Sequence, residues 1–206
     1  MQSTRPFDVS PEQGAWAVRH ARDVVEDAVE AGSRPPVPED PDPVFEVESG
    51  AFVTLHKAEA LRGCIGRPRP TQPRLEALRG AAVGAATDDP RFPPVGSNEL
   101  PAITVEVSLL SPPESLETVD PEVLTVGQDG LIVSQEGQSG LLLPQVPVDQ
   151  GWDAAEFLRA TCRKAGFPAD CWERPETRVD RFQAQVFAET EPNGPVEPVA
   201  MVSTKD

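Results

Sequence analysis

The residues with the clearest chemical potential are grouped around one cysteine. Cys64 follows Gly63, stands two residues after Arg62 and two before Gly66, and is preceded by His56, one of only 2 histidines in the chain. A thiolate is the reactive form of cysteine, and a nearby cation favours it. A thiol close to a base is the minimum needed for nucleophilic catalysis. The pattern predicts a reactive thiol, with Cys64, His56 and Arg62 as candidate catalytic residues.

Two short strands are needed to position this group. Residues 51–56 and 61–66 both alternate with a period of two, which is typical of β-strands. Residues 57–60 between them are few enough for a hairpin connection. An antiparallel register that pairs Leu55 with Gly63 collects the apolar side chains on one face, and a one-residue slip would mix the two faces.

The same register pairs Thr54 with Cys64 and His56 with Arg62, so it predicts a polar face that carries all four. Gly63 and Gly66 allow a backbone or a ligand to approach closely, and we expect them, with Thr54, among the ligand-binding residues. A second interpretation stays open. Free cysteine is usually buried as a small hydrophobe, so Cys64 could be a packing residue and His56 a solvated strand end.

Residues 61–66, LRGCIG, resemble the hallmark of the AMMECR domain family, named after the human Alport-syndrome, midface-hypoplasia and elliptocytosis chromosomal-region protein. The resemblance extends in order over about residues 10–189. It includes GAFVTL at 50–55, DPRFPPV at 89–95, EVSLLSPP at 106–113, GLLLPQV at 140–146 and FQAQVF at 182–187. The chain departs from the family in the proline-rich acidic loop at 34–43 and in the segment after Glu189.

The resemblance implies an intracellular α+β domain, one compact unit with a smaller lobe, that has no established catalytic activity. It also implies a pathway shared with Memo-like and radical SAM proteins, with which prokaryotic members are grouped. We therefore expect an AMMECR-type domain over residues 10–189 and a flexible C-terminal tail over 190–206.

The order of predicted elements agrees with an α+β fold. A serine N-cap followed by proline predicts a helix from Ser10 that stops at Gly32, and residues 152–165 predict another. Strands are expected at 102–110 and 179–188, with a hairpin around 136–139. Most of these strands are joined by short turns, whereas parallel neighbours need long crossovers. The expectation is an antiparallel-rich sheet packed with helices.

Composition excludes several classes of function. The net charge of −16 disfavours binding to nucleic acid through charge. Residues 1–20 contain no signal-peptide pattern, and no apolar run approaches the ~20 residues of a membrane span. Because 3 cysteines are an odd count without framework spacing, we expect no disulfide scaffold, with Cys162 in a core, and a reducing, cytoplasmic location. No metal site or cofactor is predicted.

The acid excess also predicts a response to salt. Only 3 of the 18 basic residues are lysines, which favours a protein of a saline cytoplasm over an ordinary acidic protein. Self-repulsion of the acidic surface is screened by salt, so stability should rise from dilute buffer to molar potassium chloride. Thermal unfolding across that range measures it, and a flat or falling curve would contradict the halophilic interpretation.

Two functions are compatible with these residues. In the first, a cleft at the LRGCIG strand binds or acts on a small anionic ligand, held by arginine, whose planar fork suits such groups. Arg91, in the proline-rich segment 89–95, is a candidate ligand-binding residue there, although that segment could equally be a turn. In the second, the groove is a non-catalytic module that binds a partner protein. Glu106 could be a general base, but an exposed strand carboxylate is the commoner case and is what we expect.

Overall fold

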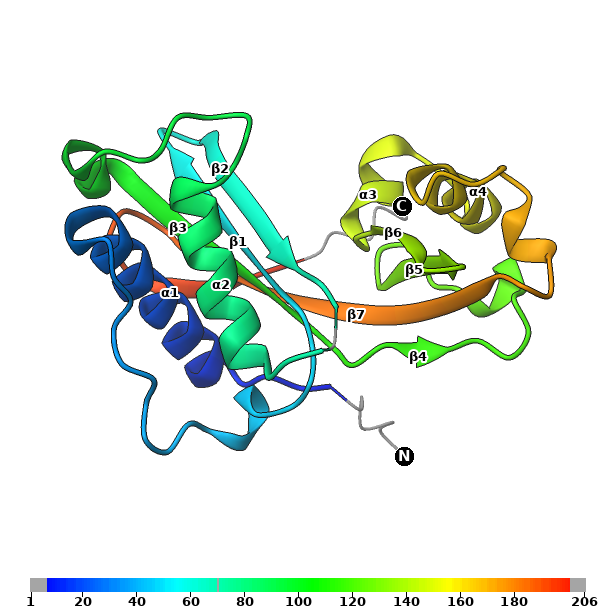
Figure 1. Cartoon of the computed structure of the whole chain (residues 1–206), viewed down its shortest axis with the longest axis horizontal. Helices are drawn as coiled ribbons and strands as arrows, with labels where there is room; N and C mark the ends of the chain where they lie inside the picture. The colour runs from blue at the N-terminus through cyan, green and yellow to red at the C-terminus, as the bar shows by residue number, and fades with distance from the viewer. Residues whose placement is uncertain (1–6, 70, 201–206) are drawn as a thin grey trace. The chain divides into compact units, whose positions relative to one another are not determined.

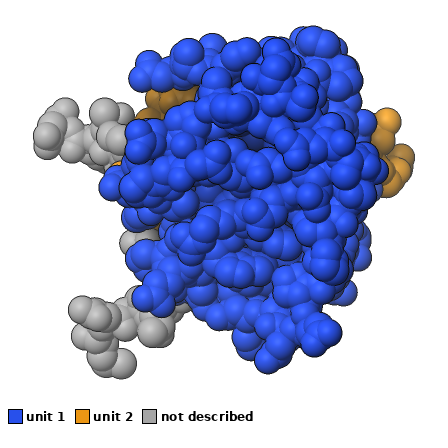
Figure 2. Space-filling model, turned by 90° about the vertical axis from the view of Figure 1, so that its left-hand side faces the viewer, with its two compact units in different colours: residues 1–112, 185–199 blue, residues 113–184, 200–206 orange. Residues whose placement is uncertain are grey.

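The alternating segments around Cys64 form a hairpin, and it belongs to the first of two compact units (Figure 1). The computed structural model describes residues 7–69 and 71–200. Residues 1–112 and 185–199 make up unit 1, drawn in blue in Figure 2, and residues 113–184 and 200–206 make up unit 2. The hairpin and the helices that cover it are all parts of unit 1.

The strands of unit 1 follow the order β2-β1-β3-β7, and β8 pairs with the end of β7. The strands are β1 (Ala51–Lys57), β2 (Ala60–Arg67), β3 (Ile103–Leu110), β7 (Arg178–Glu189) and β8 (Val196–Val199). β1 pairs antiparallel with both β2 and β3. This confirms the antiparallel-rich α+β fold, because each of these neighbours is reached through a connection that reverses the chain.

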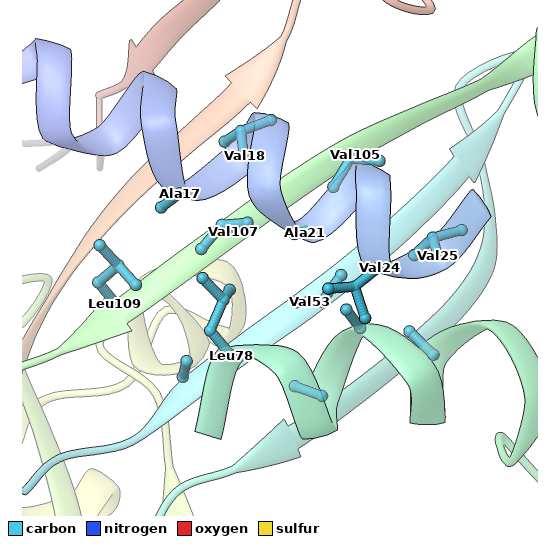
Figure 3. Packing of buried hydrophobic residues seen from close by; sticks show 14 of the residues in the cluster. Ala17, Val18, Ala21, Val24, Val25, Val53, Leu78, Val105, Val107 and Leu109 are labelled. Atoms are coloured by element: carbon cyan, nitrogen blue, oxygen red, sulfur yellow. The ribbon is translucent and has the colours of Figure 1, made fainter. Parts of the chain in front are cut away.

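Two helices cover one face of this sheet, α1 (Pro11–Ala31) and α2 (Arg74–Thr87) (Figure 3). α1 begins where the sequence predicts it: the Ser10 hydroxyl accepts from the Gln13 amide, and the Gln13 side chain accepts from the Ser10 amide. Such a reciprocal pair satisfies two amides that a helix start leaves without partners. Gly32 ends the helix in the left-handed conformation, with φ of 62°.

The core of unit 1 lies between these helices and alternate residues of the strands. Val53, Val105 and Val107 face α1 and α2 and are fully buried (Figure 3). Because side chains alternate across a strand, Thr54 and Glu106 lie on the opposite face. The described 3₁₀ turns of unit 1 are η1 (Pro43–Phe45) and η2 (Ser97–Ala102).

Unit 2 contains the other strands of the sheet and has its own core. β5 (Asp129–Gln135) pairs antiparallel with β6 (Gln138–Leu142) and with the beginning of β7, which also pairs with β4 (Glu114–Ser115). α4 (Ala154–Lys164) contributes the buried Phe157 and Leu158 to its core. The unit also contains α3 (Gln145–Gln150) and the 3₁₀ turns η3 (Pro121–Val123) and η4 (Cys171–Glu173).

Two sequence expectations are corrected outside the hairpin. Cys162 is buried as predicted, but it forms a disulfide with Cys171, because η4 brings the second cysteine to a Cα–Cα distance of 6.0 Å. Cysteine usage therefore no longer argues for a reducing compartment. Residues 196–199 of the expected flexible tail form β8 against β7, since the turn closed by the Thr190 amide and the Pro195 carbonyl returns the chain. Residues 201–206 lie outside the described part.

No helix in the described part of the chain combines the length and the apolar character that a membrane span requires.

Candidate functional site

Cys64 occupies the middle of an edge strand. Its neighbour in the sheet is Thr54 of β1, and β2 is the last strand in the order that the described residues form. On the outer side, the Cys64 amide donates to the Asp89 carboxylate at 2.8 Å, and its carbonyl accepts from Arg91 Nη2 at 3.2 Å. These two side chains replace the hydrogen bonds that a further strand would make. They satisfy the Cys64 amide and carbonyl, which would otherwise be unpaired at the edge of the sheet.

Cys64 is partly exposed and is the free cysteine of the chain. The Thr54 hydroxyl lies 3.2 Å from Sγ and can donate to it. The Arg91 guanidinium is anchored on Asp89, through Nε at 2.9 Å and Nη2 at 2.7 Å. This anchoring is the main cause that raises the pKa of Arg91, and the charge and hydrogen bond of Cys64 contribute too. The cation that contacts Cys64 is therefore Arg91, whose Nη2 donates to the backbone carbonyl of that residue.

Arg62 has a different partner from the one the sequence suggested. Its Nε and Nη2 donate to the Glu99 carboxylate at 3.1 and 2.8 Å, and its other contacts are the carbonyls of Pro93 and Pro94. Hydrogen bonds from Arg62 and Lys57 hold the pKa of Glu99 well below its usual range. Through these hydrogen bonds Arg62 holds residues 89–99 along β2. We call residues 89–99 the edge segment.

An aromatic ring connects the two arginines of this region. The Phe92 ring centroid lies 6.0 Å from the Arg62 guanidinium carbon and 5.6 Å from that of Arg91. Both distances are within the range of cation–π attraction. The motif DPRFPPV at 89–95 is therefore an ordered wall beside the LRGCIG strand. Hydrogen bonds to the Cys64 backbone hold its beginning, hydrogen bonds from Arg62 to two carbonyls hold its end, and this ring lies between them.

The predicted pairing of His56 with Arg62 is wrong, although the pairings of Thr54 with Cys64 and of Leu55 with Gly63 are confirmed. His56 instead faces Leu61. The turn is tighter than expected: Ala58 and Glu59 both have positive φ, at 49° and 64°, as a two-residue hairpin loop requires. The two-residue turn pairs His56 with Leu61, whereas the apolar register pairs Leu55 with Gly63. One residue of β2, Arg62, is left without an opposite residue and forms a β-bulge.

The glycines of the motif serve packing in this structure. A Cβ added at Gly63 would fall inside contact distance of the Ala85 carbonyl oxygen in α2, and one at Gly66 would overlap the Phe52 ring. Protein atoms therefore occupy the space that we expected a ligand to use. Gly63 allows α2 to approach β2, and Gly66 accommodates an aromatic side chain of β1.

Glu106 and His56 line a cavity of about 680 Å³ on the polar face of the sheet, within unit 1. Glu106 is opposite Thr54, and His56 is opposite Thr104. Glu106 is partly buried rather than exposed as expected, and this burial raises the pKa of its carboxyl, while the charge of His56 lowers it. Among the described residues no three His, Cys, Asp or Glu side chains are grouped to hold a metal ion.

Sequence reasoning did not select three residues that the structure places at these sites: Asp89, Glu99 and Glu106. The first two belong to the edge segment, whose rigid prolines and mixed charges were a signal for an ordered loop. Glu106 lay in a correctly predicted strand, but the cavity beside it depends on residues 188–192, which the strand pattern does not report.

Comparisons with known proteins agree with this architecture. The AMMECR1 family model matches residues 18–187. A protein of Thermococcus gammatolerans is 50% identical over 198 residues, which cover 92% of this chain and 97% of the relative. A protein of Methanothermobacter thermautotrophicus is 51% identical over 185 residues, which cover 88% and 96%.

The crystal structure of the uncharacterized protein PH0010 from Pyrococcus horikoshii superposes with a TM-score of 0.84 at 46% identity, over 94% of this chain and 99% of the other. The family model and both relatives extend over most of the sequence, including the hairpin and the edge segment. The chain belongs to the AMMECR1 family.

Proposed function

We propose that the Cys64 side of the sheet is a ligand site, in which Cys64 acts as a reactive thiol and Arg91 receives an anionic group of a small ligand. The observation that carries this proposal is a partly exposed cysteine whose backbone carbonyl accepts from a guanidinium that Asp89 holds in place. A cation beside a thiol stabilises the thiolate, which is the nucleophilic form. The Thr54 hydroxyl, at 3.2 Å, can donate a further hydrogen bond to the sulfur.

Arg91 retains capacity for a ligand. Asp89 binds its Nε and Nη2 atoms, and the side chain is 53% exposed. Nη1 takes part in none of the hydrogen bonds to Asp89 or to the Cys64 carbonyl, so this edge of the guanidinium can donate to a carboxylate or phosphate. Arg62 is less suitable, because its side chain is only 12% exposed.

A second candidate is the non-catalytic module that binds a partner protein, in a pathway shared with Memo-like and radical SAM proteins. The filled spaces at Gly63 and Gly66 favour it, because the motif then serves to pack β2 against α2 and β1. In that case the thiol would be a small packing residue without unusual reactivity. Chemical modification separates the two candidates.

We predict that iodoacetamide modifies Cys64 in the native, disulfide-bonded protein, and that Arg91→Gln slows the reaction roughly three- to tenfold, since a unit charge a few ångströms away contributes on the order of 1 kcal/mol or more. Mass spectrometry should show one adduct per chain, because Cys162 and Cys171 are bonded to each other. The rate constant is measured near neutral pH, with peptide mapping to locate the label.

Arg178→Gln is the matched control for this experiment. Arg178 also pairs with an aspartate two residues away, Asp180, and is similarly exposed, but Asp180 alone among its neighbours raises its pKa. The Arg178→Gln variant should leave the alkylation rate of Cys64 unchanged. The proposal fails if native Cys64 does not react, or if both variants alter its rate equally.

A further inference from the structure

The cavity beside Glu106 has features that the Cys64 site does not use. Its volume of about 680 Å³ is within the range of small-ligand pockets. Small apolar residues form part of its wall, namely Ala58, Ala102, Ala188 and Pro192, and all its lining residues belong to unit 1. It therefore offers space for an apolar ligand body next to a small number of charged groups.

The charges around this cavity leave one carboxylate uncompensated inside it. Glu189 lines it, but its carboxylate is bound by Arg22 at 2.5 Å. Lys57 lines it too, but its ammonium is bound by Glu99 at 2.9 Å. Glu106 has no hydrogen-bond or ion-pair partner in the ranges that the structure describes, although it is partly buried. A desolvated carboxylate without a partner gains most from a cation that enters beside it.

His56 contributes the second polar group. It lies diagonally across β1 and β3 from Glu106, and the two are close enough for the charge of His56 to affect the carboxyl. The neutral imidazole can accept a hydrogen bond from an ammonium N–H. Glu59 and Glu191 lie at the exposed rim and add negative charge to the entrance.

We propose that this cavity binds the ammonium end of a small organic amine, with Glu106 as its counter-charge and His56 as a hydrogen-bond acceptor. An organic amine suits the site better than a metal ion. Metal ions need several ligating groups, and the described chain brings no three together, whereas the apolar wall suits an alkyl chain. This site is separate from the proposed thiol site and does not depend on it.

Proton NMR of the full chain tests this proposal, because the protein has only 2 histidines. His56 is the reporter, and His20, which is stacked on Trp16 and only 8% exposed, is the internal control. Adding n-butylammonium chloride should shift the His56 imidazole signals in a saturable manner and leave those of His20 in place. Equal concentrations of n-butanol or sodium chloride should leave both in place.

Glu106→Gln, which keeps the size of the side chain, should weaken n-butylammonium binding at least about tenfold, as expected for the loss of a charged hydrogen-bond partner. Glu59→Gln removes a carboxylate from the exposed rim and should change the affinity less than about threefold. An unchanged His20 signal in Glu106→Gln shows that the core of unit 1 is intact.

Three results would overturn the proposal: no shift of His56 with the amine, an equal shift with the alcohol, or equal binding by Glu106→Gln and the wild type. The alkylation rate of Cys64, measured on the same samples, reports on the thiol site. A failure of one site is therefore seen independently of the other.

Discussion

Glu189→Ala is expected to lower the free energy of unfolding of unit 1 by about 3–5 kcal/mol, the usual cost of leaving one partner of a buried ion pair alone. Arg22 of α1 binds Glu189 of β7 through Nε at 2.6 Å and Nη2 at 2.5 Å, and their side chains are 6% and 2% exposed. Glu189 also accepts from the Val105 amide of β3 at 3.0 Å. One carboxylate thus connects a helix with two strands.

The control for this variant is Glu26→Ala. Glu26 contacts the same arginine at 3.2 Å, but it lies one turn along α1 and its side chain is 37% exposed. Pairs of this kind contribute about 0.3–0.5 kcal/mol. The double variant Arg22→Met with Glu189→Leu should recover much of the loss, because apolar residues can replace a buried pair.

Urea denaturation gives these energies, and hydrogen exchange of the β1 and β3 amides assigns the loss to unit 1. If Glu189→Ala cost no more than Glu26→Ala, the ion pair would not hold α1 to the sheet.

Gly63→Ala should destabilise the protein by about 1–3 kcal/mol, because the added methyl group has no space. The atom in its way is the backbone carbonyl oxygen of Ala85 in α2. A backbone atom cannot turn aside as a flexible side chain does, so β2 and α2 would have to separate. The same displacement would move the neighbouring Cys64 relative to Arg91, and the alkylation rate of the thiol should change as well.

Gly80→Ala is the matched control, since it adds the same methyl group to α2, the helix that packs on Gly63. In α2, its nearest neighbour would be Arg67 Nε at 3.5 Å, an ordinary contact. Alanine is favoured over glycine within a helix by up to ~1 kcal/mol, so this variant should be neutral or stabilising. Melting temperatures show whether each variant is stabilised or destabilised, with a shift of about 2–4 °C per kcal/mol for a protein of this size. If Gly63→Ala were as stable as the wild type, the interpretation that Gly63 is needed for packing against α2 would be wrong.

The sequence alone was sufficient for features that depend on local periodicity. Strand alternation predicted which residues of β1 share a face, and it predicted that Thr54 opposes Cys64. The cap at Ser10 and the stop at Gly32 predicted both ends of α1. Each of these depends on residues a few positions apart, whose geometry is set by the backbone itself.

The partners of the charged residues were decided by the tertiary structure. The sequence favoured Arg62 as the cation beside Cys64, but Glu99 binds Arg62, and it is Arg91, held by Asp89, that contacts Cys64. The choice depends on the path of the edge segment along β2, which no pattern within the hairpin reports.

The bulge at Arg62 and the Cys162–Cys171 disulfide have the same kind of cause. The bulge reconciles a tight turn with an apolar register, two local preferences that differ by one residue. The disulfide needs η4 to fold back on α4. Local periodicity determined the faces of the strands and helices. Only the tertiary structure determined which side chains meet, because those contacts depend on how distant segments pack.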